Sequence, residues 1–329
     1  MRCNLTSAAS YPIRFLKEIP TVWTPDQVPA IKRYAARYRK GIMLFQCIEE
    51  DNDCSLWHNV FRLNDTDTLR SSCICPMVAL RVSLSGLLHF RAGELGEFEL
   101  APRQALLFYL PRPTSELILS GGKEYTFFDI LLPEKYMQHF LPYYTILPPF
   151  ARKMADRVAT SLTSFPIRLS APGLHYIDRL LNCTYTGSLR SMYIDARIMD
   201  TMTEVLSIAE GSAKREIQLT DEETSRILQI RKLLGENLHK HYRIKDLSRM
   251  VYINEYKLKR GFQQVVGASI FDYQLNRRMQ EAQMHLSNTE MSLEEIAEAT
   301  GYQYLSSFIS AFRHHFGLTP SVFRKQWRR

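Results

Sequence analysis

The sequence is poor in long apolar runs and in cysteine, and both shortages limit what the protein can be. No stretch of its 329 residues approaches the roughly 20 consecutive apolar residues of a membrane-spanning helix. The first residues lack the apolar segment of a secretory signal, so we expect a cytoplasmic protein. The six cysteines, none of them after Cys183, match no zinc-binding spacing. Because His58 and His89 lie far apart and no His-x-His pair occurs before residue 211, we expect neither a metal site nor a cofactor.

Cys73 and Cys75 are separated by one residue, a spacing that could serve a metal ion or a redox response. Cysteines of a cytoplasmic protein are usually reduced and unpaired. Few cysteine pairs of this spacing bind a metal. We therefore expect free buried thiols at both positions.

The positive charge is concentrated toward the carboxyl end. The formal net charge of the whole chain is +8. Residues 222–329 contain 17 Lys+Arg and 11 Asp+Glu, a net charge of +6, which leaves +2 for the first 221 residues. A basic segment of this kind suits a polyanionic partner such as nucleic acid.

Residues from about 41 to 132 have the pattern of a β-rich region. The segments MVALRVSLSGLLHF, EFELAPRQALLFYL, SELILSG and YTFFDILL are short and apolar, and glycines and prolines separate them. Short strands with closely spaced turn residues are typical of a sandwich or a barrel. LFQCIEE and LWHNVFRL, earlier in the chain, add two further candidate strands.

From about residue 133 to 210 the pattern becomes helical. PEKYMQHFLPYY, PFARKMADRVATSLTS and GLHYIDRLLNCTY precede a longer candidate helix from Ser188 to Glu210. Its apolar residues recur at spacings of three and four, which is one stripe of an amphipathic helix. The stripe could pair with its twin in a homodimer or pack on the β-rich region, and both alternatives remain open. Its members are Leu189, Met192, Met199, Met202 and Leu206, the candidate dimer contacts, together with Ala196.

Residues 211–220, GSAKREIQLT, are polar and contain a glycine, which is typical of a linker. Thr220 and Glu223 then fit a capping box that begins a helix. One face of that helix carries Ile227, Ile230, Leu234 and Leu238. We therefore predict an α+β protein of two domains. Residues 1–210 form a β-rich domain with added helices, and residues 221–329 form an all-helical domain.

Nearly the same apolar pattern occurs twice in this second domain. Each copy predicts a short helix, a tight turn and a second helix with two apolar anchors four residues apart on one face. The corresponding residues are Leu247 and Ile296, Ser248 and Ala297, Leu258 and Phe308, and Phe262 and Phe312.

These copies predict two helix-turn-helix units, at about 244–267 and 292–317, joined by one helix. Gly301 suits the second turn because glycine adopts positive φ without strain, whereas the first turn, at Tyr252–Ile253, has no glycine. We expect Gly267 and Gly317 to end the second helix of each unit. The joining helix would be about 27 Å long, which could hold two reading helices near the roughly 34 Å between successive major grooves.

The residues of this repeat closely resemble the DNA-binding domain of the AraC/XylS family of transcriptional regulators. The resemblance is carried by RRMQEAQMHL, SLEEIAEATGY and SSFISAFRHHFGLTPSVFRK and covers about a third of the chain. INEYKLKRGFQQVVGAS further resembles the PchR-like branch, several members of which respond to ferric siderophores. In relatives the amino-terminal half binds an effector or dimerises, often on a cupin-like β-barrel, and the β-rich segment agrees with that architecture. The effector-binding residues stay unknown.

The resemblance implies that the second helix of each unit enters the major groove of double-stranded DNA. Lys259 and Arg260 suit guanine O6 and N7. The serines of the second unit are short, so we expect its helix mainly to position the protein. Arg278, in the joining helix, could make either an internal ion pair or a phosphate contact. The DNA-facing positions are Glu255, Tyr256, Lys259, Arg260, Gln303, Tyr304, Leu305, Ser306, Ser307, Ser310 and Arg313, with His314 and His315 near the backbone.

Three functions fit these features. The first is a non-enzymatic transcription regulator, an activator that senses a small molecule and contacts RNA polymerase. The second is a DNA-repair alkyltransferase, which some carriers of this module are. Its chemistry needs a reactive thiolate, but the only Pro–Cys neighbours, in CICPM, have the reverse order and no following histidine. The third is a regulator without a ligand, controlled by a protein partner. A cavity of about 300 Å³ or more with converging polar groups would favour a ligand.

Overall fold

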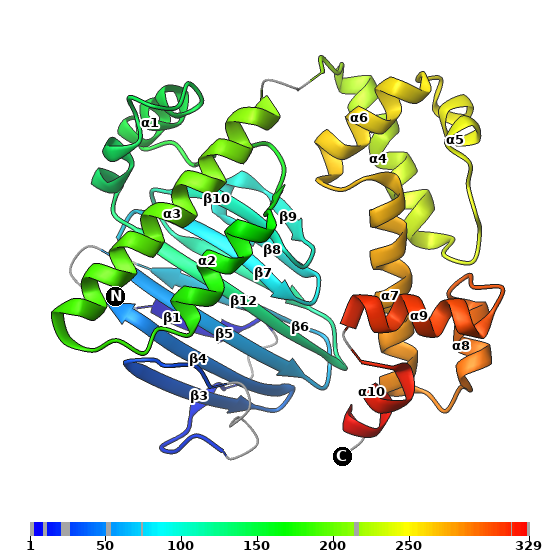
Figure 1. Ribbon diagram of the computed structural model, residues 1–329, viewed down its shortest axis with the longest axis horizontal. Coiled ribbons are helices and arrows are strands. Elements are labelled where there is room, and N and C mark those ends of the chain that lie inside the picture. Colours follow the sequence, from blue (N-terminus) through cyan, green and yellow to red (C-terminus); the bar gives the residue numbers. More distant parts are fainter. Residues whose placement is uncertain are drawn as a thin grey trace. The chain divides into compact units, whose positions relative to one another are not determined.

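The computed structural model describes residues 3–8, 12–20, 27–50, 54–73, 75–213, 217–316 and 318–327. The chain divides into two compact units, residues 1–215 and 216–329 (Figure 1). The strands of the amino-terminal unit are β1 (Cys3–Ser7), β2 (Arg14–Phe15), β3 (Lys32–Tyr38), β4 (Gly41–Glu50), β5 (Ser55–Leu63), β6 (Asp67–Cys73), β7 (Met77–Ser85), β8 (Leu88–Ala92), β9 (Glu97–Leu100), β10 (Gln104–Leu110), β11 (Thr114–Leu119), β12 (Lys123–Leu132), β13 (Thr160–Ser161) and β14 (Ile167–Arg168).

Helical segments complete this unit and make up the other. The amino-terminal unit contains the 3₁₀ helices η2 (Gly93–Leu95) and η3 (Glu134–His139) and the helices α1 (Leu147–Ala155), α2 (Ala171–Leu181) and α3 (Gly187–Ala213). The carboxyl-terminal unit contains α4 (Asp221–Glu236), α5 (Ile244–Val251), α6 (Glu255–Val266), α7 (Ile270–Asn288), α8 (Leu293–Ala299), α9 (Leu305–Phe316) and α10 (Pro320–Trp327).

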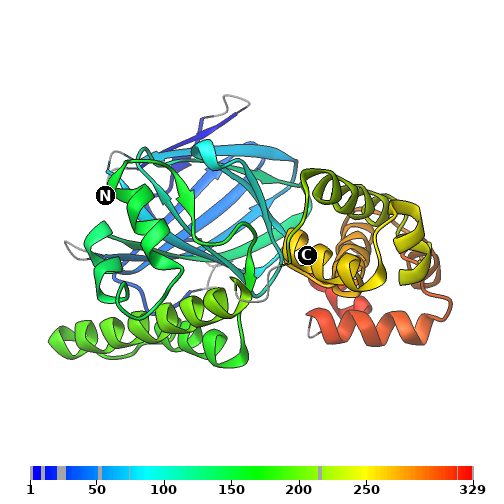
Figure 2. The same ribbon diagram turned by 90° about the horizontal axis from the view of Figure 1, so that it is seen from above.

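Two antiparallel sheets form the amino-terminal unit. One has the order β1-β6-β11-β8-β9; the other follows β13-β10-β7-β12-β5-β4-β3-β2, with β14 also paired to β10. Every residue of β10 is buried, and successive side chains of a strand point to opposite faces. Leu106 and Phe108 therefore join the core between the sheets, whereas Leu107 and Tyr109 join the core shared with α1, α2 and α3. The helices cover the other face of the larger sheet (Figure 2), which confirms a β-rich unit with added helices.

The strands extend beyond the predicted limits. β1, β2 and β3 all begin before residue 41. The helix predicted over 149–164 is wrong in its second half, because α1 ends at Ala155 and β13 follows. Arg157 adopts a φ of 58° there, which reverses the chain. The residues after it can then pair with β10.

The apolar stripe predicted on α3 divides between two faces of the helix. Leu189, Met192 and Met199 are 56%, 70% and 38% exposed. Met202 and Leu206 are fully buried, because they belong to the core that α3 shares with the larger sheet. Those two residues are therefore wrong as dimer contacts, since they stabilise their own unit. Only the exposed part of the stripe is available to a partner.

Cys73 is disulfide-bonded, which corrects the expectation of a free thiol at this position. Cys75 is a free thiol as expected, but it is exposed and not buried. The sequence separation of two cysteines does not show which strands lie side by side, and this proximity decides whether a bond can form.

The predicted capping box is present at the start of α4. Thr220 Oγ1 accepts a hydrogen bond from Glu223 N at 3.1 Å, and Glu223 Oε2 accepts one from Thr220 N at 2.9 Å. Ile227, Ile230 and Leu234 are buried on one face of α4, as predicted, whereas Leu238 is buried in the loop after it, because α4 ends at Glu236. Of the residues expected to form a linker, 211–213 continue α3 and 214–216 lie outside the described residues.

Candidate nucleic-acid interface

Two helix-turn-helix units are present in the carboxyl-terminal unit, formed by α5 and α6 and by α8 and α9. The second turn contains Gly301 at φ 83°, as predicted. The first turn solves the same problem without glycine: Tyr252 itself adopts φ 54°, a left-handed conformation that is strained for an L side chain. Ser248 Oγ donates to Ile253 O at 2.6 Å across this turn. Asn254 Oδ1 then accepts from Lys257 N at 2.8 Å and caps α6.

The second helix of each unit is anchored by the predicted apolar pair. Leu258 and Phe262 on α6, and Phe308 and Phe312 on α9, are fully buried. The ring centroids of Phe308 and Phe312 lie 5.8 Å apart. Because each anchor pair faces inward, the opposite face of each helix is open to solvent. Gly317, predicted to end α9, lies outside the described residues, whereas Gly267 ends α6 at φ 74°.

The open faces carry the predicted DNA-facing side chains. Arg260 and Tyr256 lie on the same face of α6, with the guanidinium carbon 6.0 Å from the ring centroid, so the tyrosine steadies the charged group. Leu305 departs from the prediction, because it is half-buried against the core beneath α9. The exposed positions are Glu255, Tyr256, Lys259 and Arg260 on α6 and its start, and Gln303, Tyr304, Ser306, Ser307, Ser310, Arg313 and His314 in the second unit.

The two open faces differ in chemistry. The face of α6 presents Lys259 and Arg260, two long cationic donors, beside the carboxylate of Glu255. The face of α9 presents hydroxyls in its first half and has its positive charge at the last turn, at Arg313. Long cationic side chains can reach base edges from a distance, whereas short hydroxyls reach bases or phosphates only at close approach.

The segment before α4 is fastened to α6. Ile217 N donates to Gln264 Oε1 at 3.0 Å, and Gln264 Nε2 donates to Ile217 O at 3.2 Å. Lys257 Nζ lies 2.5 Å from Glu223 Oε1. The hydrogen bond from Lys257 lowers the pKa of Glu223 from its ordinary value. These contacts could not be predicted from the sequence, because no pattern in it distinguishes Gln264 and Lys257 from the other polar residues of their helix.

Arg278 is buried in α7, with 7% of its surface exposed. Among the described residues it forms no ion pair, and it bonds backbone carbonyl oxygens instead. Its Nε donates to Leu238 O at 2.9 Å and its Nη2 donates to Lys240 O at 3.1 Å. Burial lowers the pKa of its guanidinium from the ordinary value. The ring of Tyr302 lies beside it, with 5.8 Å between the guanidinium carbon and the ring centroid.

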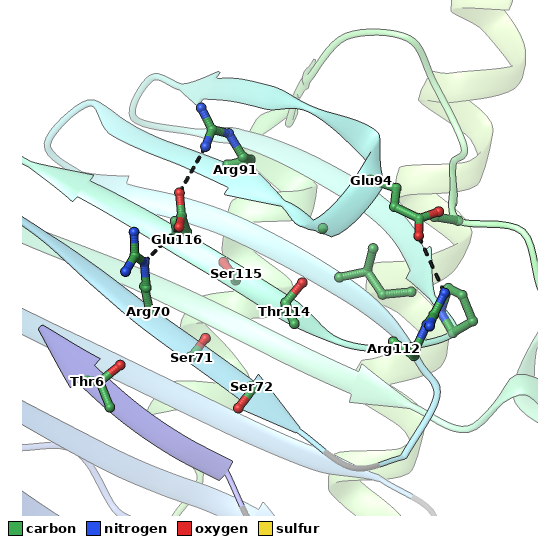
Figure 3. Close-up of a pocket in the computed structure, with 14 residues that line it drawn as sticks. Thr6, Arg70, Ser71, Ser72, Arg91, Glu94, Arg112, Thr114, Ser115 and Glu116 are labelled. Atoms are coloured by element: carbon green, nitrogen blue, oxygen red, sulfur yellow. Dashed lines mark hydrogen bonds and ion pairs between the residues drawn. The ribbon is translucent and has the colours of Figure 1, made fainter. Parts of the chain in front are cut away.

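A pocket of about 710 Å³ lies in the amino-terminal unit, over the five-stranded sheet (Figure 3). A row of side chains crosses it from β6 through β11 to β8: Arg70, Glu116 and Arg91. Arg70 is exposed whereas its neighbour Leu69 is buried between the sheets. The row therefore lies on the outer face, since neighbouring side chains of a strand alternate. Thr6, Ser72 and Thr114 add hydroxyls to the same face.

Glu116 organises the charges of this pocket. Its Oε1 accepts from Arg70 Nε at 2.8 Å and its Oε2 accepts from Arg91 Nη1 at 3.1 Å. Arg91 Nη2 also donates to Glu97 at 2.5 Å, and this bond lowers the pKa of Glu97. Within the described part of the chain, the two terminal nitrogens of Arg70 make no hydrogen bond. The sequence did not reveal these residues, because they come from separate strands.

Two features are absent from the residues that the structure describes. No group of three or more His, Cys, Asp or Glu side chains among them is placed to hold a metal ion. No helix among them has the length and apolarity to cross a membrane.

Comparison with known proteins gives matches to both units. A family model described as the regulatory protein PchR N-terminal domain matches residues 37–219, and one described as a helix-turn-helix domain matches residues 247–326. The Msm operon regulatory protein of Streptococcus mutans is 30% identical over 98 residues, which are 30% of this chain and 35% of that protein. The HTH-type transcriptional regulator YdeO of Escherichia coli K12 is 38% identical over 87 residues, 26% of this chain and 34% of that protein.

This chain therefore spans about a third of the length of the curated relatives that it matches. Among solved structures, ToxT of Vibrio cholerae aligns with 82% of this chain and 97% of its own, at 13% identity and a TM-score of 0.29.

The two family matches cover different parts of the molecule. The PchR match spans more than half of the chain, and the helix-turn-helix match spans most of the remainder. Their order agrees with the β-rich unit and the repeated helical unit described above. The chain therefore belongs to the AraC/XylS family of regulatory proteins, in the branch that carries the PchR amino-terminal domain.

Proposed function

We propose that the protein is a sequence-specific DNA-binding transcription regulator that inserts α6 and α9 into successive major grooves of one duplex. The observation that carries the proposal is the pairing of two open helix faces on one unit, each opposite a buried aromatic or aliphatic anchor pair. The carboxyl-terminal third also holds most of the excess positive charge, which favours a polyanion. The relatives matched in this region are named as regulators.

Base reading falls mainly to α6 in this proposal. Arg260 is exposed and steadied by Tyr256, and a guanidinium can donate two parallel hydrogen bonds to guanine O6 and N7. The hydroxyls of α9 would fix its position on the phosphate backbone, with Arg313 adding charge at the end of the helix. In this proposal, α6 recognises the base sequence and α9 positions the protein on the phosphate backbone.

The test measures the affinity of the Arg260→Ala variant for a duplex selected by the wild-type protein and for its base-substituted versions. Specific affinity should fall by about 1–3 kcal/mol and discrimination should relax at one base pair. Lys232→Ala is the matched control, because it removes the same charge from an exposed position on α4. Equal losses in both variants, with discrimination unchanged, would show that Arg260 contributes only general electrostatic attraction.

We further propose that the amino-terminal unit senses a small organic anion in the pocket over the five-stranded sheet. The pocket exceeds the volume named above as favouring a ligand. Arg70 is oriented by Glu116 through Nε, so its terminal nitrogens are free to form a two-pronged bond to a carboxylate. The nearby hydroxyls of Ser72 and Thr114 suit further oxygen atoms of the ligand. Negatively charged ferric siderophores, which the family resemblance implies, belong to this class.

Citrate and ferric citrate are suitable first probes, titrated calorimetrically into the full-length protein. Arg70→Gln should abolish the heat of binding, whereas Arg152→Gln, an exposed change on α1, should keep it. Binding that is identical in the two variants would remove this pocket as the anion site. Control by a protein partner instead of a ligand remains the alternative function of this unit.

The exposed part of α3 supports a proposal of dimerisation. Leu189, Met192 and Met199 lie on one side of the helix and are large apolar groups in contact with solvent. Met192→Glu should convert a dimer into monomers in analytical sedimentation. A dimer of unchanged stability in this variant would place the contact elsewhere.

The resemblance favours activation, which we propose occurs through contact with RNA polymerase. The measurement is transcription in vitro from a promoter that carries the selected site, with purified polymerase and with or without the protein. More transcript in its presence supports an activator, and less transcript identifies a repressor.

A further inference from the structure

The two helix-turn-helix units are connected at a second place besides α7. The loop between α4 and α5, residues 237–243, meets the turn of the second unit at a cluster of five residues that we call the junction. Its members are Leu238, Lys240, His241, Arg278 and Gly301. The distance from His241 Nε2 to Gly301 O is 2.9 Å, with the imidazole donating. Arg278 holds the loop through the carbonyl oxygens of Leu238 and Lys240.

The junction leaves no space for adjustment. A Cβ atom added at Gly301 would lie 2.6 Å from Leu238 O and 2.9 Å from Arg278 Nη2. Gln274 Nε2 adds a further bond to Lys240 O at 2.8 Å. Each carbonyl held here belongs to an irregular segment that lacks a helical partner for it, and an unpaired buried carbonyl is costly. Arg278 satisfies two of them from one rigid group.

The position of these segments in the chain gives the junction its meaning. The loop leads directly into α5, and the turn containing Gly301 leads directly into α9. If α7 were the only connection, the relative position of the two units would change whenever α7 bent or twisted. The junction adds a second connection, which joins the loop before α5, the turn before α9 and α7 to one another. Two connections resist rotation of the two units relative to each other.

We infer that Arg278 is a positioning residue, which fixes the spacing and angle at which α6 and α9 are presented to DNA without contacting the DNA itself. This inference rests on the proposed function. Two linked reading helices bind more tightly than one by roughly 10²–10⁴-fold, and this gain disappears when geometry forbids both from binding. One base pair inserted between the half-sites shifts them by about 3.4 Å and about 36°. If the two units are rigidly connected, the protein therefore loses the gain in affinity on the altered duplex. If the connection is loosened, the protein recovers part of that gain.

The experiment compares three duplexes: the selected site with both half-sites, the same site with one base pair inserted between them, and a duplex with one half-site only. Arg278→Lys keeps the positive charge and removes the fork that reaches both carbonyls. Arg277→Lys is the matched control, because it makes the same change one position earlier on α7, where the side chain contacts Gln280 instead. His241→Phe opens the junction from its exposed side.

For the wild type and Arg277→Lys we expect the insertion to cost roughly ten-fold or more in affinity, a part of the bivalent gain. For Arg278→Lys and His241→Phe the insertion should cost several times less, while affinity for the single half-site stays unchanged. An insertion penalty equal to that of the wild type in both variants would overturn the inference.

A loss of affinity in both variants that is the same for all three duplexes would also overturn the inference, because it would show only damage to folding. If Arg278→Lys does not fold, His241→Phe decides the question. Failure of the wild-type protein to prefer two half-sites over one would instead refute the proposed function, so the two failures are distinguishable.

Discussion

The stability of the amino-terminal unit should depend on pH through His58, on β5. This residue is 6% exposed, and its Nδ1 lies 2.9 Å from Gln46 Nε2. Gln46 Oε1 accepts from Val28 N at 2.9 Å, which fixes the amide so that Nε2 donates to the imidazole. Nδ1 must then accept, so the ring is neutral with its proton on Nε2. Protonation would set two donors against each other in a buried place.

Burial lowers the pKa of His58 from 6.5 to about 4. Above pH 6.5 both the folded and unfolded states hold the ring neutral, and the folded state has its full stability. As the pH falls from 6.5 toward 4, the unfolded state takes up a proton that the folded state refuses, so stability falls. The difference in pKa corresponds to about 3 kcal/mol of unfolding free energy lost across this window.

The assay is urea denaturation of the full-length protein at several pH values between 7 and 4, followed by hydrogen exchange of peptides from the β4–β5 hairpin. His58→Gln is neutral at every pH and can still accept from Gln46. The wild type should lose about 3 kcal/mol more than this variant as the pH falls, because carboxylates that titrate in both proteins cancel. Parallel curves for the two proteins would refute the assignment of a neutral, buried imidazole.

Two further predictions concern positions with close local contacts. Gly301→Ala should destabilise the carboxyl-terminal unit by about 1–3 kcal/mol, because the position combines positive φ with a blocked Cβ site; unchanged unfolding by calorimetry would contradict this. Asp129→Asn should cost about 3–5 kcal/mol, because it leaves Arg81, whose side chain is 12% exposed and is now bonded to both carboxylate oxygens at 2.8 and 3.0 Å, with an uncompensated charge. The double variant Arg81→Met with Asp129→Leu should regain most of that loss, and no recovery would show that packing, not charge, dominates the site.

The carboxyl-terminal unit could be predicted well because its signals are local. Apolar anchors four residues apart on α6 and α9 fix which face is buried, and the capping box at Thr220 and Glu223 fixes where α4 begins. The prediction for the first turn had no local support, yet the turn forms. Its chain neighbours Val251 and Ile253 are buried, and their packing holds the exposed Tyr252 in a conformation that its own side chain disfavours.

The amino-terminal unit was predicted less well because its structure depends on contacts between distant segments. On α3, spacing alone could not separate Met199, which is exposed, from Met202, which is buried against the sheet. The pocket was missed for a similar reason: Arg70 and Glu116 are neighbours only through strand pairing. Register is set by the whole sheet and leaves no mark in either strand by itself.

The fastening of residues 217–223 to α6 has a mechanical consequence. Gln264 forms hydrogen bonds with both the N–H and the carbonyl oxygen of Ile217, and Lys257 forms an ion pair with Glu223, six residues later. The chain that enters the carboxyl-terminal unit is therefore fixed to α6 along residues 217–223. A displacement of the chain before residue 217 would therefore act on α6 first and on α9 only afterwards.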